Sequence, residues 1–124
     1  MTTLKLKKVF IIAEAGVNHN GSIELAKKMI DVAKECCVDA IKFQTFKAER
    51  VVSKKAEKAQ YQKDASNESE SHFEMLKKLE LDLEAHKDLI AYCEKKNIMF
   101  LSTPFDHDSI DMLLSLIHIS EPTR

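Results

Sequence analysis

Polar side chains follow or interrupt three apolar runs of this sequence, and their types suit acid–base and anion chemistry. Glu14 comes directly after the run Val9–Ala13. Lys42 and Gln44 alternate with apolar residues in a second run, and Thr103 follows a third. A carboxylate can exchange a proton with a substrate, and a lysine ammonium can pair with a phosphate or a carboxylate. These residue types predict a site for an anionic small molecule, with Lys42 at the anion and Glu14 at a proton or a hydroxyl.

The apolar runs that carry these residues are typical of buried parallel strands. Val9–Ala13 is too short to cross a membrane and too apolar for a strand with one face in water, so we expect a strand covered on both faces. Ala40–Thr45 predicts a second strand on which Lys42 and Gln44 share one face, and Ile98–Ser102 predicts a third. Groups at the carboxyl ends of such strands form the active sites of barrels and open α/β sheets.

Segments with helical spacing lie between and after the expected strands. Apolar residues recur every three to four positions, and residues that favour helix N-termini precede them. The helices are expected at about Ile23–Cys36, from a capping box at Ser71 to about Leu79, at about Leu83–Lys96 and from Ser109 onward. Strand, helix and strand joined by short connections form a right-handed unit with parallel strands. We therefore expect an α/β fold in which the polar strand ends share one rim.

The composition indicates one soluble domain, or part of a larger one. The 124 residues are 44% hydrophobic and 31% charged, with a net charge of −1. This charge predicts neither a nucleic acid nor an anionic membrane as partner, and no apolar run approaches the roughly 20 residues that span a bilayer. Cys36, Cys37 and Cys93 form a poor disulfide framework, so we expect reduced thiols in a cytoplasmic protein.

Three segments resemble the N-terminal domain of the N-acetylneuraminate (sialic acid) synthase family. They are Ile12–Gly21 (IAEAGVNHNG), Ile41–Thr45 (IKFQT) and Phe100–Asp106 (FLSTPFD). Their order and spacing extend the resemblance over about Val9–Leu114. The first two segments are more similar to the sialic and legionaminic branch of the family than to its pseudaminic branch.

This resemblance implies an enzyme larger than the present chain. Members of the family fold as a (β/α)8 TIM barrel followed by a small antifreeze-like domain, and they work as homodimers. They condense phosphoenolpyruvate with an N-acetylated amino sugar to form a nonulosonic acid and phosphate. A divalent metal ion, Mn or Mg, polarises the sugar aldehyde. Both N-acetylmannosamine and 2,4-diacetamido-trideoxymannose stay open as the acceptor.

The resemblance also implies roles for particular side chains. Glu14 matches a catalytic acid beside the reacting carbons, which shuttles a proton or stabilises positive charge at C2. Lys42 matches a lysine that binds the phosphate of phosphoenolpyruvate, and Asn67 matches a loop asparagine at the same site. The residues that match the lining of the amino-sugar side are Gln44, Thr103 and Phe105.

Each of these residues also has a purely structural interpretation. Glu14 could cap the next helix, and Lys42 could extend from a strand end into solvent. Asn67 lies in a long polar segment, and asparagine is common in loops. Thr103 could cap a turn, and Phe105 could pack at the rim of the sheet.

His19 and the segment Asp106–Asp108 contain residue types that bind metals, but we expect both to have structural roles. His19 is expected to be a hydrogen-bonded loop residue. Consecutive residues rarely converge on one ion, so Asp106–Asp108 is expected to supply acids to a helix N-terminus. The metal-binding histidines of the family match no part of this chain, so we expect the ligands of a divalent metal to be missing here.

Two features depart from the family's pattern. Cys37 stands where the family usually has glycine, at a helix end where a left-handed residue is expected. Residues 1–114 match the first three of eight βα units, whereas 115–124 resemble translated sequencing-adapter read-through. We therefore expect a partial TIM barrel with a non-native tail, inactive as given. The alternatives are a non-functional truncated product and another phosphate-binding barrel such as an aldolase.

Overall fold

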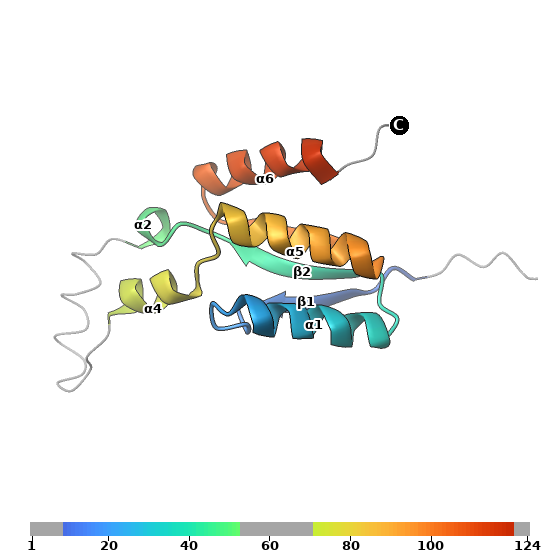
Figure 1. Cartoon of the computed structure of the whole chain (residues 1–124). Coiled ribbons are helices and arrows are strands. Elements are labelled where there is room, and N and C mark those ends of the chain that lie inside the picture. Colours follow the sequence, from blue (N-terminus) through green and yellow to red (C-terminus); the bar gives the residue numbers. More distant parts are fainter. Residues whose placement is uncertain (1–8, 53–70, 121–124) are drawn as a thin grey trace, which may run out of the picture.

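The computed structural model describes residues 9–52 and 71–120, with side chains through residue 116 (Figure 1). Three strands pair in parallel in the order β1-β2-β3. They are β1 (Ile12–Gly16), β2 (Ala40–Thr45) and β3 (Met99–Pro104). The helices are α1 (Ile23–Glu35), α2 (Ala48–Val51), α4 (His72–Leu79), α5 (Leu83–Lys96) and α6 (His107–Ser120). The expected α/β class with a parallel sheet is confirmed.

The long helices cover one face of the sheet. Helix α1 packs against β1 and β2, and α5 and α6 pack against β3 (Figure 1). The core between helices and sheet contains the nearly fully buried side chains of Ile30, Ile41, Phe43, Leu89 and Cys93. A strand order that advances in one direction, with crossovers of one hand, places successive helices on the same face. A doubly wound sheet differs, because its strand order reverses and helices cover both faces.

The opposite face of the sheet, here called the open face, is partly exposed among the described residues. Strand residues alternate between the two faces, and Ile12, Lys42 and Met99 lie on the open one. Ile12 is 44% exposed and Met99 is 50% exposed, although both are apolar. No helix within residues 9–52 and 71–120 is long and apolar enough to cross a membrane.

The expectation of a buried strand over Val9–Ala13 was wrong. Strand β1 begins at Ile12, and Val9, Phe10 and Ile11 before it are all exposed. The ladder to β2 starts with Ile12 opposite Ala40, and Ile11 before it accepts hydrogen bonds from Asp39 N and Ala40 N through its carbonyl. Among the described residues β1 is not covered on both faces either, because Ile12 on its open face is 44% exposed.

The other two strands follow the sequence pattern more closely. Strand β2 has the expected bounds, with Ile41 and Phe43 buried against the helices. Strand β3 starts at Met99 and runs through Pro104, two residues beyond the expected end, because Pro104 still lies opposite Thr45 of β2. A proline can occupy this last position since no further ladder donor is needed from it.

The helix N-termini are capped as their sequences predict. The Ser22 side chain accepts a hydrogen bond from Leu25 N, and Asp82 caps α5 in the same way. Ser71 and Glu74 form the expected capping box at α4. Helix α6 continues through Ser120, and so includes residues 115–120. A helical conformation does not show whether residues 115–124 are native to the protein. The non-native tail therefore stays a prediction.

Cys37 ends α1 in the left-handed conformation that its position predicted. Its φ is +62°, and its N–H donates to Lys34 O while Val38 N donates to Ala33 O. These two bonds form a Schellman motif, in which glycine is the usual left-handed residue because a Cβ is strained there.

Replacing Cys37 with glycine is expected to raise the free energy of unfolding by about 1 kcal/mol, because it relieves the left-handed strain. Urea unfolding of the chain would measure this. The matched control is Asn97→Gly at the end of α5, where φ is +60°. Asparagine tolerates this conformation better than cysteine, so the control should gain less. Equal gains at the two sites would contradict the explanation from left-handed strain.

Candidate functional site

The structure brings Glu14 and Lys42 together on the open face of the sheet. The two residues are partners in the β1–β2 ladder, and Glu14 Oε1 lies 3.3 Å from Lys42 Nζ. Their side chains are 52% and 36% exposed. An ion pair this exposed contributes only about 0–1 kcal/mol. An anionic ligand could therefore take the Lys42 ammonium from Glu14 without a large loss of stability.

A β-bulge beside Glu14 shapes this end of β1. The ladder to β2 shifts register between Glu14 and Gly16, and Ala15 between them is buried. Gly16 has a φ of +58°, and a Cβ built there would lie 3.6 Å from both Glu14 Oε2 and Gln44 Nε2. Bulges re-aim side chains next to active sites. This bulge was not expected from the sequence, although a glycine at the end of an apolar strand is a signal for one.

The residues expected on the amino-sugar side lie at the same strand ends. Gln44 and Thr103 are partners in the β2–β3 ladder, so they share the open face with Lys42. Phe105 follows β3, with its N–H bonded to Thr45 O at 3.0 Å and its side chain 53% exposed. Asn67 lies outside the described residues. The roles of all these residues stay predictions.

A chain of buried and partly buried hydrogen bonds lies on the helix-covered side of these strand ends. Thr45 Oγ1 is 2.6 Å from Ser102 Oγ and 2.7 Å from His86 Nε2, and His86 Nδ1 is 2.9 Å from Asp82 O. Thr45 and His86 are fully buried. His86 was not among the residues expected from the sequence, although it lies three and seven residues before Leu89 and Cys93, on the same inner face of α5.

His19 is a buried, hydrogen-bonded loop residue, as expected. Its Nδ1 accepts from Gly21 N at 2.9 Å, and its ring packs near Phe43 with 6.0 Å between centroids. The Nε2 atom has no hydrogen-bond partner among the described residues. Burial lowers the pKa of His19, and the nearby His86 lowers it further.

The acids of Asp106–Asp108 serve a helix N-terminus, as expected. Asp106 Oδ1 accepts from Ser109 N at 2.7 Å, and its other oxygen accepts from Lys47 N at 2.8 Å. Asp108 pairs with Arg50 at 2.9 Å. Within the described ranges, no three His, Cys, Asp or Glu side chains gather in a group that could hold a metal ion.

The chain is expected to lose stability as pH falls from about 7.5 to 5.5. Burial lowers the pKa of His86 as well as that of His19 below the ordinary 6.5. The unfolded chain therefore binds protons before the folded chain does, which lowers the free energy of unfolding as pH drops through 6.5 and toward the folded values. Urea unfolding at several pH values would measure this slope. It should be flatter in His86→Gln, and an unchanged slope would count against the explanation.

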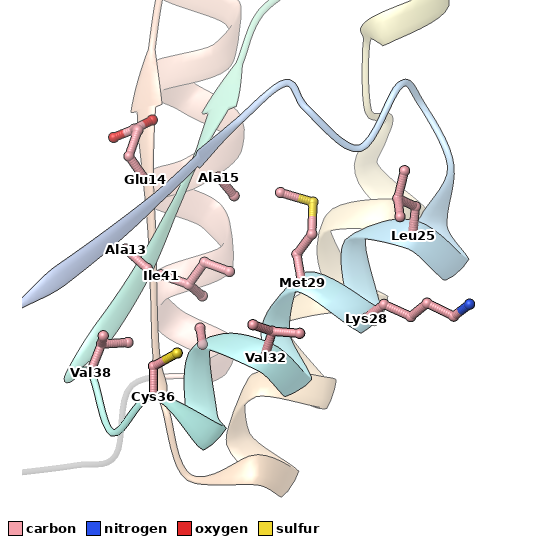
Figure 2. A pocket seen from close by; sticks show the side chains of 11 residues that line it. Ala13, Glu14, Ala15, Leu25, Lys28, Met29, Val32, Cys36, Val38 and Ile41 are labelled. Carbon is pink, nitrogen blue, oxygen red and sulfur yellow. The ribbon is translucent and has the colours of Figure 1, made fainter.

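An apolar groove lies between α1 and the edge strand β1, with a cavity volume of about 450 Å³. Its apolar lining includes Ala13, Leu25, Met29, Val32 and Ile41. Figure 2 shows the Glu14 carboxylate on the far side of β1 from α1, pointing away from these side chains. Glu14 is nevertheless one of the residues that line the groove, so the groove adjoins the charged site at β1.

The sequence model of the NeuB family matches residues 29–120, which is more than half of the chain. The chain belongs to the NeuB family. It is 55% identical over 111 residues to an N,N'-diacetyllegionaminic acid synthase of Campylobacter jejuni. It is also 55% identical over 107 residues to a protein of the same name from Legionella pneumophila. These matches cover 90% and 86% of this chain but 33% and 30% of the relatives, so the chain spans about a third of their length.

More distant members of the family and solved structures agree with this result. Identity is 35% to a human N-acetylneuraminate-9-phosphate synthase over 86% of the chain and 30% of that protein. A crystal structure of N-acetylneuraminic acid synthetase from Leptospira borgpetersenii, in complex with citrate, superposes with a TM-score of 0.68 at 31% identity, over 94% of this chain and 38% of that one. The resemblance to the sialic acid synthase family is thus confirmed.

Proposed function

We propose that the chain is the first part of a synthase that condenses phosphoenolpyruvate with an N-acetylated amino sugar, forming a nonulosonic acid and releasing phosphate. Of the two acceptors, we propose 2,4-diacetamido-trideoxymannose over N-acetylmannosamine. The 55% identity to two N,N'-diacetyllegionaminic acid synthases supports this choice. The observation that carries the proposal is the Glu14–Lys42 pair, 3.3 Å apart at the strand ends of a NeuB-family sheet.

We propose further that the three βα units belong to a (β/α)8 barrel. The strand order β1-β2-β3 and the helices on a single face support this. In a closed barrel the open face becomes the interior, which accounts for apolar side chains such as Met99 on it. The edge of β1 would then pair with a further strand, and the apolar groove beside it would receive that strand's helix.

In this proposal the chain's own residues bind the substrates and move a proton. The Lys42 ammonium binds the phosphate of phosphoenolpyruvate by charge-assisted hydrogen bonds. Glu14, released from Lys42, handles the proton or stabilises positive charge at C2. Gln44 and Thr103 make hydrogen bonds to the amino sugar. Asn67 would join Lys42 at the phosphate.

The described residues do not supply a set of ligands for the divalent ion, Mn or Mg, that the resemblance implies. No group of three potential ligands is present within residues 9–52 and 71–116. None of the steps above is therefore assigned to a metal.

We also propose that the complete enzyme is a homodimer in the cytoplasm. The free thiols of Cys36, Cys37 and Cys93 support the cytoplasmic location, because disulfides are rare in that compartment.

A graft tests the proposed function. Residues 9–116 of this chain would replace the matching segment of the Campylobacter jejuni synthase, to which identity is 55%. We expect phosphate release from phosphoenolpyruvate that requires the diacetamido sugar and is slower with N-acetylmannosamine. A folded graft without turnover would contradict the proposal, and a preference for N-acetylmannosamine would overturn the choice of acceptor.

The 124-residue chain alone is expected to release no phosphate from phosphoenolpyruvate with either sugar. Among the described residues, the three strands leave both edges of the sheet without a further strand, and the Glu14 and Lys42 side chains are partly exposed. Measured alongside the graft, this assay separates a competent segment that needs the rest of the barrel from a segment that has lost its function.

A further inference from the structure

We propose that Ser102, Thr45 and His86 form a buried clamp that positions Gln44 and Thr103 for the amino sugar. These three are positioning residues, because they lie on the helix-covered side of the sheet and do not reach its open face. The catalytic consequence rests on the proposed function, whereas the effect of the clamp on Gln44 and Thr103 does not.

The hydrogen-bond directions in the clamp follow from its chemistry. Asp82 O is a carbonyl and can only accept, so His86 Nδ1 carries the proton in that bond. Burial lowers the pKa of His86 and keeps its ring neutral near pH 7, so Nε2 accepts from the Thr45 hydroxyl. Thr45 Oγ1 then accepts from the Ser102 hydroxyl. The chain therefore runs in one direction, from Ser102 through Thr45 and His86 to Asp82.

The clamp lies directly behind the Gln44–Thr103 pair. Thr45 follows Gln44 on β2, and Ser102 precedes Thr103 on β3, while Gln44 and Thr103 face each other in the ladder. The bond between the Thr45 and Ser102 hydroxyls therefore crosses diagonally behind this pair. It ties the two strands together at the point where their open-face side chains would meet a substrate.

Helix α5 holds the clamp in place. Asp82, which accepts from His86, is the N-cap of α5 and is fixed by a 2.8 Å bond from Ala85 N. The His86 ring also lies edge-on to Phe100 of β3, with 6.3 Å between centroids. A polar atom of the clamp that lost its partner away from water would destabilise this arrangement. The bonds from His86 to Thr45 and Asp82, with the ring contact to Phe100, therefore fix the ends of β2 and β3 relative to α5.

Two substitutions at Thr45 separate the hydroxyl from the packing. Thr45→Val keeps the shape but leaves His86 Nε2 and Ser102 Oγ without their partner. Thr45→Ser keeps the hydroxyl but loses the methyl group. A role in packing alone would make the serine variant the more damaging of the two, and a clamp would make the valine variant the more damaging.

The experiment uses the graft with 13C-labelled threonine methyl groups and 15N-labelled glutamine side chains. In Thr45→Val we expect the signals of Thr103 and Gln44 to shift, and in Thr45→Ser we expect them to stay near their original positions. With the diacetamido sugar and phosphoenolpyruvate as substrates, Thr45→Val should raise the KM for the sugar about tenfold, as one buried hydrogen bond would. The KM for phosphoenolpyruvate should change less than twofold, because Lys42 lies further down β2.

The outcomes separate the two claims. Unmoved Thr103 and Gln44 signals in Thr45→Val, or equal effects of valine and serine, would overturn the clamp. Parallel rises in both KM values would also overturn it, since a general loss of structure has that effect. Shifted signals in a folded graft without turnover would leave the clamp in place and refute the proposed function.

Discussion

Replacing Glu14 with glutamine is expected to lower the turnover number of the graft by roughly 10²–10⁴-fold, the usual contribution of a general acid or base. Glutamine keeps the shape of the side chain and can still hydrogen-bond, but it cannot carry the proton or the negative charge. The Glu14 carboxylate lies beside a β-bulge on the open face, within 3.3 Å of Lys42. The measurement is kcat with both substrates saturating.

The chain offers a close control for this substitution. Asp88 is 47% exposed and pairs with Lys27 at 3.1 Å, much as Glu14, 52% exposed, pairs with Lys42. Asp88→Asn breaks an equivalent surface ion pair that joins α1 to α5 and has no assigned part in the site, so it should leave kcat unchanged. An unchanged rate in Glu14→Gln would remove Glu14 from the mechanism. An equal fall in both variants would point to lost stability.

The Lys42→Ala variant of the graft is expected to raise the KM for phosphoenolpyruvate roughly 10- to 100-fold, because a charge-assisted hydrogen bond contributes about 1.5–3 kcal/mol. The KM for the amino sugar should change much less. In the structure the Lys42 ammonium lies 3.3 Å from the Glu14 carboxylate, and the Lys42 side chain is 36% exposed. Steady-state kinetics with each substrate varied in turn would measure the two constants.

Lys27→Ala is the matched control for Lys42. The Lys27 side chain is 32% exposed, pairs with Asp88 and lies over the Tyr92 ring, so its loss removes the same charge from a similarly exposed ion pair. Its KM for phosphoenolpyruvate should stay at the original value. If both lysine variants raise this KM equally, Lys42 acts only through the overall charge of the protein. If neither does, Lys42 is a solvated strand-end lysine, as its structural interpretation holds.

The elements of this fold follow from local signals in the sequence. Ser22, Ser71 and Asp82 each precede a helix that they cap, because their side chains satisfy N–H groups that the first turn leaves without partners. Asn97 ends α5 in the left-handed conformation for a similarly local reason. The one wrong strand, Val9–Ala13, shows the limit of such signals. Apolar character predicts burial, but ladder pairing decides where a strand begins.

The candidate site was only partly predictable. Lys42 and Gln44 were expected on one face from their alternation along β2, and the structure places them there. The approach of Glu14 to Lys42 depends on the register between two strands, which alternation along one strand does not specify. The bulge that shapes this end of β1 arises from the same pairing, as a register shift before Gly16.

The sequence alone determined the family, the order of strands and helices, and the residue types available for chemistry, because motifs and caps depend on neighbouring residues. The tertiary structure alone decided which of these residues meet. It joined Glu14 to Lys42 across two strands and placed His86 of α5 on Thr45, 41 positions earlier in the chain. Such contacts depend on how strands pair and helices pack, and those are interactions between segments far apart in the sequence.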